Sequence, residues 1–175
     1  AIYRMLSFIE GKFLSESKHS YKLFSNFGKI LGQINKELLK LEDETIESRK
    51  IEWDIKNLNW NRKYLEYIED VETKKLVEYF ILQFNENVFS NDCNLRKSII
   101  HNDANDWNIL VNKDNIIGVI DFGDMVNTYL INEVAIALSY ILIEKKDIIK
   151  WVIKFLKPYN KSIKLKSIEI DLLYY

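Results

Sequence analysis

Residues 98–124 read SIIHNDANDWNILVNKDNIIGVIDFGD, and this stretch carries most of the polar side chains that point to chemistry. Two short β-branched segments, 109–111 and 116–120, flank a turn that is rich in Asn and Asp. This pattern predicts a β-hairpin. Asn108 precedes the first strand and Asp121 follows the second, so antiparallel pairing would place both at the open end of the hairpin.

Asp103 lies one short loop upstream of Asn108, and we expect it to reach the same end of the hairpin. Two carboxylates and a carboxamide would then converge with no cysteine nearby. Hard oxygen ligands of this kind suit Mg²⁺ rather than zinc. Protein-bound Mg²⁺ usually completes its coordination shell with water and substrate phosphates, so the cluster indicates phosphoryl chemistry.

The spacing of these residues resembles a known signature. His-x-Asp-x-x-x-x-Asn at 101–108, followed by a hairpin and Asp-Phe-Gly at 121–123, is similar to the catalytic and metal-binding loops of the protein-kinase-like superfamily. Asn102 stands where regulated protein kinases have Arg. The match is instead to the aminoglycoside phosphotransferase and choline kinase-like family of small-molecule kinases.

Within that family the sequence resembles the hydroxylysine kinase branch, which also occurs fused to class III aminotransferases. The resemblance rests on HNDANDWN at 101–108 and IDFGDMV at 120–126, and less specifically on YRMLSFIEG at 3–11 and WDI at 53–55. It implies an α+β, mostly α fold: the C-terminal helical lobe of a protein-kinase-like domain, with a short catalytic β-hairpin. No Gly-rich phosphate loop, strand Lys or partner helix Glu is recognisable, so we expect the N-terminal lobe to be absent.

The resemblance also implies a division of residues 1–175 as a partial phosphotransferase domain. The expected parts are a connector from the absent lobe (1–11), a helical region (12–97), the catalytic and metal-binding loops with the hairpin (98–124), and truncated C-terminal helices (125–175).

Carried over residue by residue, the resemblance assigns the main roles in the site. Asp103 would be the catalytic base, and Asn108 and Asp121 would hold the Mg²⁺ that bridges the phosphates of ATP or GTP. His101 would brace the loop. Glu133, at the start of a buried helix, would accept hydrogen bonds from catalytic-loop amides, because a buried carboxylate needs partners.

Three further acids have two interpretations each. Asp106 and Asp124 would help to bind a cationic substrate or a second metal, or would simply be solvated loop acids. Asp54 would contact the substrate or cap a helix. We expect Trp107 to pack, and we assign no functional role to His19 or Cys93.

The rest of the chain reads mainly as helix, because it contains one Pro and five Gly. We expect a strand over 2–9 and helices over 21–41, 61–69, 73–88, 130–143, 147–156 (ending before Pro158) and from Ser167. Residues 42–52 read as a solvated connector and 85–97 as irregular. Gly28 and Gly32 indicate close packing against another helix. The buried stripe predicted for 73–88 is Leu76, Val77, Phe80, Phe84 and Val88.

Composition excludes several classes of protein. With 25 Lys and Arg against 26 Asp and Glu, the chain has no general attraction to nucleic acid or to anionic membranes. No apolar segment reaches the roughly 18 residues needed to span a bilayer. A single cysteine excludes an internal disulfide and a Cys-rich zinc site, and it favours a reducing, cytoplasmic location.

Three hypotheses follow for function. In the first, the chain is a lobe of a kinase that transfers the γ-phosphate of a nucleotide to a hydroxyl of an amino-bearing metabolite, such as a hydroxylysine-like, amino-alcohol or aminoglycoside substrate. In the second, it is a non-catalytic kinase-like fragment or binding module. A metal-dependent nuclease that uses Asp103, Asp121 and Asp124 is disfavoured, because no basic tract is present. The expected partners are a small molecule, a nucleotide and, in a longer protein, fused domains.

Overall fold

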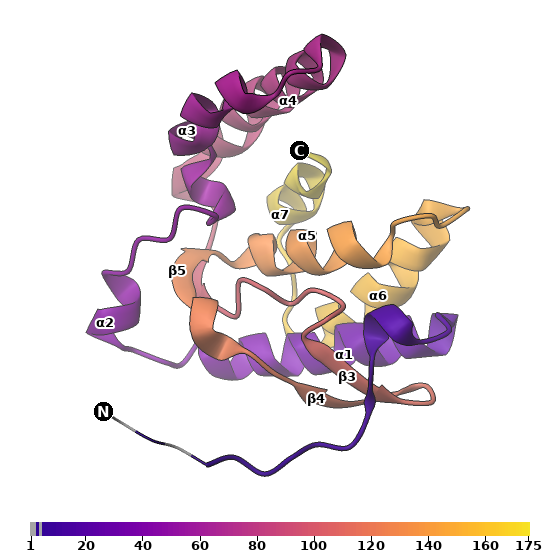
Figure 1. The fold of residues 1–175 in the computed structure, drawn as a ribbon. Coiled ribbons are helices and arrows are strands. Elements are labelled where there is room, and N and C mark those ends of the chain that lie inside the picture. Colours follow the sequence, from indigo (N-terminus) through magenta and orange to yellow (C-terminus); the bar gives the residue numbers. More distant parts are fainter. Residues whose placement is uncertain (1–2, 4) are drawn as a thin grey trace.

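The computed structural model describes residue 3 and residues 5–175, and Figure 1 shows their arrangement. The helices are α1 (Tyr21–Leu38), α2 (Glu44–Glu47), α3 (Leu58–Asn61), α4 (Val71–Gln83), α5 (Leu130–Ile141), α6 (Ile148–Ser162) and α7 (Ser167–Asp171). The strands are β1 (Lys12–Phe13), β2 (Lys97–Ile100), β3 (Ile109–Asn112), β4 (Asn115–Val119) and β5 (Val126–Tyr129). The chain is therefore mostly helical with a short hairpin, as the sequence predicts, and it also has a second small sheet, β2-β5, that the sequence analysis did not predict.

Both sheets are antiparallel, and together they enclose the catalytic stretch. The first sheet has the order β1-β3-β4, with Phe13 opposite Leu110 and Ile109 opposite Val119. The second pairs β2 with β5. Because the hairpin β3–β4 lies between β2 and β5 in the sequence, the loops that enter and leave it are both held by the second sheet.

The tip of the hairpin is fixed to the start of α1. The Ser20 hydroxyl donates to Asp114 Oδ1 at 2.6 Å, and Asn26 Nδ2 donates to the Asp114 carbonyl oxygen at 2.7 Å. Ser20 also caps α1, since its Oγ accepts the Leu23 N–H at 3.0 Å. One residue of the turn thus joins the hairpin to the longest helix of the chain.

Helices α1 and α6 pack at very close range, which confirms the interpretation of the two glycines. A Cβ on Gly28 would lie 2.1 Å from the Phe155 carbonyl oxygen, and one on Gly32 would lie 2.9 Å from that of Tyr159. Phe27 and Phe155 meet edge to face beside this contact, with ring centroids 5.3 Å apart. The absence of side chains at the two glycines therefore allows the backbones to touch.

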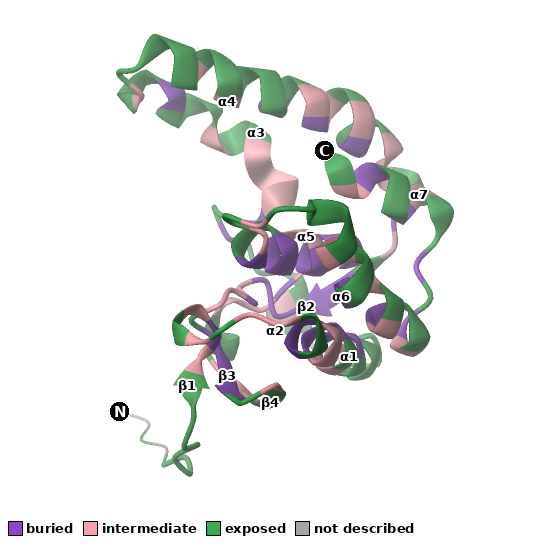
Figure 2. Ribbon diagram, turned by 90° about the vertical axis from the view of Figure 1, so that its right-hand side faces the viewer, coloured by how far each residue is buried: buried purple, intermediate pink, exposed green. Residues whose placement is uncertain are grey.

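Helix α5 forms the centre of the core, and α4 lies at the periphery. Figure 2 shows α5 largely buried and most of α4 exposed.

An ion pair holds the C-terminal helix. The buried Glu169 of α7 accepts from Arg96 Nε at 2.7 Å and Nη2 at 2.6 Å. This ion pair fixes α7 to the residue that precedes β2. No helix of the described residues is long and apolar enough to cross a membrane.

Two predictions at the ends of elements are wrong. The described residues of 2–9 (3 and 5–9) are exposed and form no strand; pairing begins at Lys12, where β3 offers a partner, and residues 1, 2 and 4 lie outside the described part. Helix α6 does not stop before Pro158 but continues to Ser162. Burial of Phe155 and Tyr159 against α1 outweighs the N–H that proline lacks.

The region between α2 and β2, which we call the helical insert (residues 55–94), also differs from expectation. The helix predicted over 61–69 is α3 followed by a 3₁₀ segment, Arg62–Tyr67. The helix predicted over 73–88 starts at Val71 and ends in a π turn, Phe84–Val88. The stretch 85–97, expected to be irregular, is instead mostly helical: it continues this π turn and then forms a 3₁₀ segment, Phe89–Asn94. Of the predicted stripe, Phe84 and Val88 are buried and Val77 is partly buried, but Leu76 and Phe80 are exposed. The reason is that only part of α4 packs against the main body of the protein.

We predict that Gly28→Ala destabilises the protein, although alanine favours helix over glycine by about 1 kcal/mol. The new Cβ would meet the backbone of Phe155, which cannot turn aside as a side chain can, and overpacking of this kind costs about 1–3 kcal/mol. Urea denaturation followed by circular dichroism measures the difference. Lys29→Ala, on the exposed face of the same helix, is the control, and a Gly28→Ala protein as stable as wild type would contradict the packing described above.

Candidate active site

Asp103 is the centre of the candidate site, and two carboxamides orient it. Asn105 Nδ2 donates to Asp103 Oδ1 at 2.7 Å, and Asn108 Nδ2 donates to Asp103 Oδ2 at 2.7 Å. Asn108 Nδ2 also donates to the Asp103 carbonyl oxygen at 2.8 Å. Each carboxylate oxygen keeps a lone pair for a further donor, so Asp103 is oriented yet still able to accept a proton.

His101 joins the two loops of the site. Its Nδ1 accepts the Asp103 N–H at 3.2 Å, so its Nε2 carries the proton and donates to the Ile120 carbonyl oxygen at 2.9 Å. Burial lowers the pKa of His101, which favours this neutral form. The ring also packs against Phe122, with centroids 4.5 Å apart. These are the contacts of a structural brace between Asp103 and the residue before Asp121.

Glu133 supports the same loop from α5. It is fully buried, and its Oε2 accepts the His101 N–H at 2.7 Å, with the Asn102 N–H as a second donor. Burial raises the pKa of Glu133 to about 7, against the two amide donors, and the nearby Asp103 raises it further. Asn102 has a left-handed backbone, φ 66°, so the loop turns sharply at the residue that Glu133 holds.

Asn108 and Asp121, the residues predicted to hold Mg²⁺, lie on neighbouring backbone segments and offer oxygen atoms as ligands. The Ile120 N–H donates to the Asn108 carbonyl oxygen at 3.0 Å, which places Asp121 directly beyond this bond. Because Asn108 directs its Nδ2 to Asp103, its Oδ1 is left for a ligand. Asp121 is exposed, with φ 61°, and its Oδ1 accepts the Gly123 N–H at 3.3 Å. This amide and carboxylate oxygen pair fits Mg²⁺, which takes few protein ligands.

The described residues contain no cluster of three or more His, Cys, Asp or Glu side chains with the geometry of a metal site.

An apolar cavity of about 650 Å³ opens beside Asp121. The N-terminal segment 6–9 forms one wall, and the hairpin forms the other through Leu110 and residues 119–120. Asp121 and Phe122 complete its lining. Figure 1 shows the N-terminal segment running alongside the hairpin. The cavity thus offers an apolar surface that leads directly to a carboxylate.

The three acids with open interpretations lie in different surroundings. Asp54 is buried and caps the turn 55–57: its Oδ1 accepts the Lys56 N–H at 3.0 Å and the Thr128 hydroxyl at 2.8 Å. It therefore takes the capping alternative, and burial raises its pKa. Asp106 borders a separate hollow of about 450 Å³, which His19 and Trp151 also line. Asp124 is partly exposed in the turn after Asp121.

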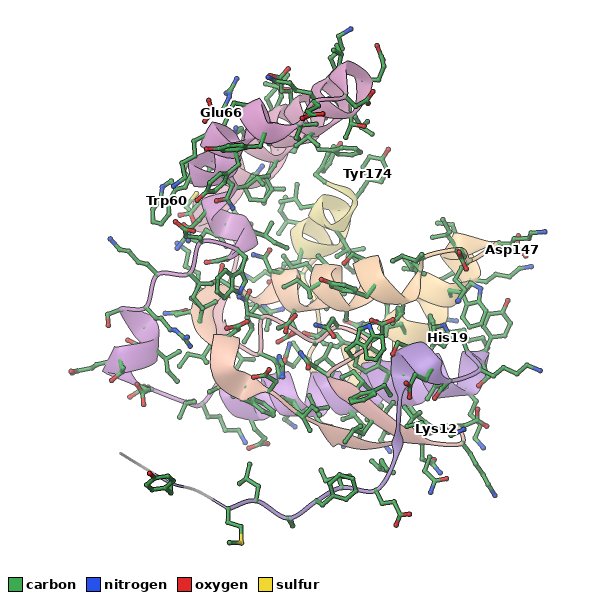
Figure 3. The ribbon with its side chains drawn as sticks, in the orientation of Figure 1. Lys12, His19, Trp60, Glu66, Asp147 and Tyr174 are labelled. Atoms are coloured by element: carbon green, nitrogen blue, oxygen red, sulfur yellow. The ribbon has the colours of Figure 1, made fainter. Side chains whose placement is uncertain are left out.

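Trp107 and His19, to which the sequence assigns no catalytic role, both make contacts near the start of the chain. The Trp107 ring packs against Phe13, with centroids 5.4 Å apart, although it is 56% exposed. His19 Nε2 lies 3.1 Å from the Leu14 carbonyl oxygen. Figure 3 places His19 near the start of α1, on the other side of the fold from Trp60 in the helical insert.

Two residues that the sequence analysis missed contact the site. Asn105 orients Asp103, and its Oδ1 accepts the N–H groups of Trp107 at 2.8 Å and Asn108 at 3.1 Å. The spacing of its carboxamide, two residues after Asp103, is a signal that could have revealed it. Arg49 donates from Nη1 to the carbonyl oxygens of Gly123 and Met125, and nothing local in the sequence indicates this distant contact.

Comparison with known proteins places this geometry in context. Residues 1–156 match the sequence model of the phosphotransferase enzyme family. The hydroxylysine kinase of Mus musculus is 28% identical over 185 residues, with 99% of this chain and 49% of the mouse protein covered. The hydroxylysine kinase of Xenopus laevis is 30% identical, with 98% and 50% covered. The chain spans about half the length of the curated relatives it matches.

Solved structures share the fold. The amicoumacin kinase hAmiN, solved with AMP-PNP and Ca²⁺, superposes with a TM-score of 0.65 at 18% identity, covering 94% of this chain and 52% of that one. An aminoglycoside phosphotransferase from Streptomyces rimosus, in complex with ADP and streptomycin, gives 0.60 at 13% identity, covering 95% and 68%. The protein-kinase-like fold predicted from the sequence is confirmed.

We predict that Glu133 makes the protein less stable as the pH rises from about 4.5 to 7. The folded state holds the Glu133 proton up to about pH 7, whereas the unfolded chain releases it near the ordinary value of 4.5, so the folded state binds more protons in this range. The loss is roughly 3 kcal/mol, since each tenfold change in the ionisation constant corresponds to about 1.4 kcal/mol.

Urea denaturation of wild type and Glu133→Gln at pH 5 and pH 8 tests this. Glutamine keeps an acceptor for the His101 N–H but has no proton to lose in this range, so the stability difference between variant and wild type should move in favour of the variant at pH 8. An unchanged difference would mean that Glu133 ionises as an ordinary exposed carboxyl.

Proposed function

Because the chain belongs to the phosphotransferase enzyme family, we propose that it is the catalytic lobe of a small-molecule kinase. This kinase would transfer the γ-phosphate of ATP or GTP to a hydroxyl of an amino-bearing metabolite, with a hydroxylysine-like amino acid as the first candidate. The observation that carries the proposal is the Asp103 carboxylate, oriented by Asn105 and Asn108 at the open end of the hairpin.

Asp103 would act as the catalytic base. It would accept a hydrogen bond from the acceptor hydroxyl and take the proton as the new oxygen–phosphorus bond forms and the bond to the nucleoside diphosphate breaks. His101 and Glu133 would keep the loop in the geometry that this step needs, because they hold the backbone on both sides of Asn102. Their role is positioning rather than proton transfer.

Asn108 Oδ1 and the Asp121 carboxylate would hold Mg²⁺. When bound, the ion neutralises charge on the nucleotide phosphates and aligns the reacting group. The apolar cavity supports a nucleotide on this side, because a base and ribose placed against Leu110 would direct the phosphates toward Asp121.

Acids near Asp103 favour an acceptor that carries an amine. Asp106 and Asp124 flank the two loops, and neither forms an ion pair among the described residues, although Lys145 lines the hollow beside Asp106. A cationic acceptor would be attracted by this charge. The partners we propose are therefore a nucleotide and a small cationic molecule, in a reducing, cytoplasmic location indicated by the single Cys93.

A non-catalytic binding module is the second candidate. The apolar cavity beside Asp121 favours it, because such a cavity can hold a ligand whether or not phosphate is transferred. Such a module would bind a nucleotide at the apolar cavity without transferring phosphate.

We predict that Asp103→Asn abolishes phosphoryl transfer and leaves nucleotide binding in place. Loss of a general base typically lowers rates by about 10²–10⁴-fold. The assay follows ³²P transfer from ATP or GTP to hydroxylysine, for this chain and for any longer product of its gene, with Mg²⁺ present. Asp171→Asn, an exposed acid on α7, is the control. Wild-type protein that binds ATP but phosphorylates no hydroxylated amine would favour the binding module, and an active Asp103→Asn protein would refute the assignment of the base.

We predict that Asn105→Asp changes the pH dependence of transfer. Aspartate keeps the acceptor for the Trp107 and Asn108 N–H groups but places a second carboxylate 2.7 Å from Asp103 in place of a donor. Repulsion between the two acids should move the acidic limb of kcat/KM to higher pH. Asn105→Ala removes the donor without adding charge, and it should lower the rate with no comparable movement. Coincident profiles for all three proteins would exclude Asn105 from orienting Asp103.

A further inference from the structure

Arg49 lies between α2 and the turn 55–57, yet it contacts the loop that follows Asp121. Its Nη1 donates to the Gly123 carbonyl oxygen and, at 3.2 Å, to the Met125 carbonyl oxygen. Five residues later Asp54 accepts from Thr128 in β5. The connector is thus attached at two points to the segment 121–129, and Figure 1 shows α2 beside this segment.

The guanidinium of Arg49 is anchored but not neutralised. Within the described part of the chain it forms no ion pair, although Asp121 and Asp124 belong to the loop that it contacts. Both of its hydrogen bonds come from Nη1, and they go to neutral carbonyl oxygens. The residue is exposed, and among the described residues its Nε and Nη2 groups have no hydrogen-bond partner, so they remain available as a planar fork of donors.

Arg49 contacts the loop that follows Asp121 but does not line the apolar cavity. The cavity lies between the N-terminal segment and the hairpin, and Asp121 and Phe122 line it. Arg49 is hydrogen-bonded to the next part of the same loop, at the carbonyl oxygens of Gly123 and Met125. In phosphoryl transfer the attacking and leaving oxygens lie roughly in line on opposite sides of phosphorus, so a nucleotide in the cavity leaves the opposite side for the acceptor.

We propose that Arg49 binds a carboxylate of the phosphate acceptor, so that the acceptor is a hydroxylated amino acid rather than an amino sugar or a simple amino alcohol. The inference rests on the proposed function, because it takes the acceptor to lie beside Asp103. A fixed cation would repel an acceptor whose only charges are ammonium groups. An acceptor with both charges would pair its carboxylate with Arg49 and an amine with Asp124, which belongs to the loop that Arg49 contacts.

The experiment measures binding and transfer with three probes of matched shape. These are 5-hydroxylysine, its carboxamide, which has the same size without the negative charge, and 1,5-diaminopentan-2-ol, which lacks the carboxyl group. Calorimetry gives each Kd in the presence of AMP-PNP and Mg²⁺, and ³²P transfer gives each kcat/KM. The proteins are wild type, Arg49→Gln, Arg49→Lys and the control Arg62→Gln, an exposed arginine of the helical insert.

Wild type and Arg62→Gln should bind hydroxylysine about 10- to 100-fold more tightly than the two probes that lack a carboxylate. This is the usual strength of a charge-assisted pair of hydrogen bonds. Arg49→Gln should bind all three probes alike, and Arg49→Lys should recover part of the preference, because it keeps the charge but loses the fork. If Arg49 had a purely structural role, Arg49→Gln would not weaken the binding of hydroxylysine selectively.

Other outcomes overturn the inference. Equal affinity of wild type for the three probes would refute it. If Arg49→Gln weakens all probes equally, Arg49 only positions the loop; if it raises the KM of ATP instead, the anion is a nucleotide phosphate. A protein that shows the Arg49-dependent preference in calorimetry but transfers no phosphate would leave the carboxylate site standing and refute the proposed kinase activity.

Discussion

The neutral imidazole of His101 connects the two halves of the site, and the other contacts depend on it. One ring nitrogen accepts from the backbone of Asp103, and the other donates to Ile120, the residue before Asp121. Because a single proton on the ring satisfies both bonds, protonation of the second nitrogen would break the contact to Asp103. Burial opposes that protonation by lowering the pKa of His101. The geometry between a base and a metal ligand is thus set by the tautomer of one side chain.

The scaffold around His101 brings together segments that are distant in the sequence. Glu133 holds the loop from α5, Asp114 fixes the hairpin tip to α1, and Arg96 joins β2 to the buried Glu169 of α7. In each case a buried or partly buried acid accepts donors from another element, so its removal would leave donors without partners. The site is therefore positioned by polar contacts, while the core behind it is fixed by the close approach of α1 and α6.

The sequence predicted the features that depend on local pattern. The hairpin, the long α1, the buried α5, the close packing at Gly28 and the placement of Asp103 near Asn108 all follow from periodicity, turn residues and motif spacing. The course of α6 through Pro158 and the exposure of Leu76 and Phe80 depend on which partner surface each helix finds, which local pattern does not specify. Arg49 was missed for the same reason: its partners lie more than 70 residues away. Asn105 could have been found, because it stands inside the motif 101–108, two residues after Asp103.

The helical insert differs from the rest of the molecule in how little of it is buried. In α4 only Ile81 is buried, whereas nine residues of α5 are. Because local unfolding free energy follows buried contacts, we expect the insert to open more easily than the body that carries Asp103. Substitutions on its surface would then cost little global stability. A lineage could thus change the size or polarity of this region, which lies over the C-terminal end of the chain near Tyr174 (Figure 3), while the phosphoryl-transfer loops stay intact. The fold thus separates a weakly packed region, where substitutions should be tolerated, from the loops that carry the candidate chemistry.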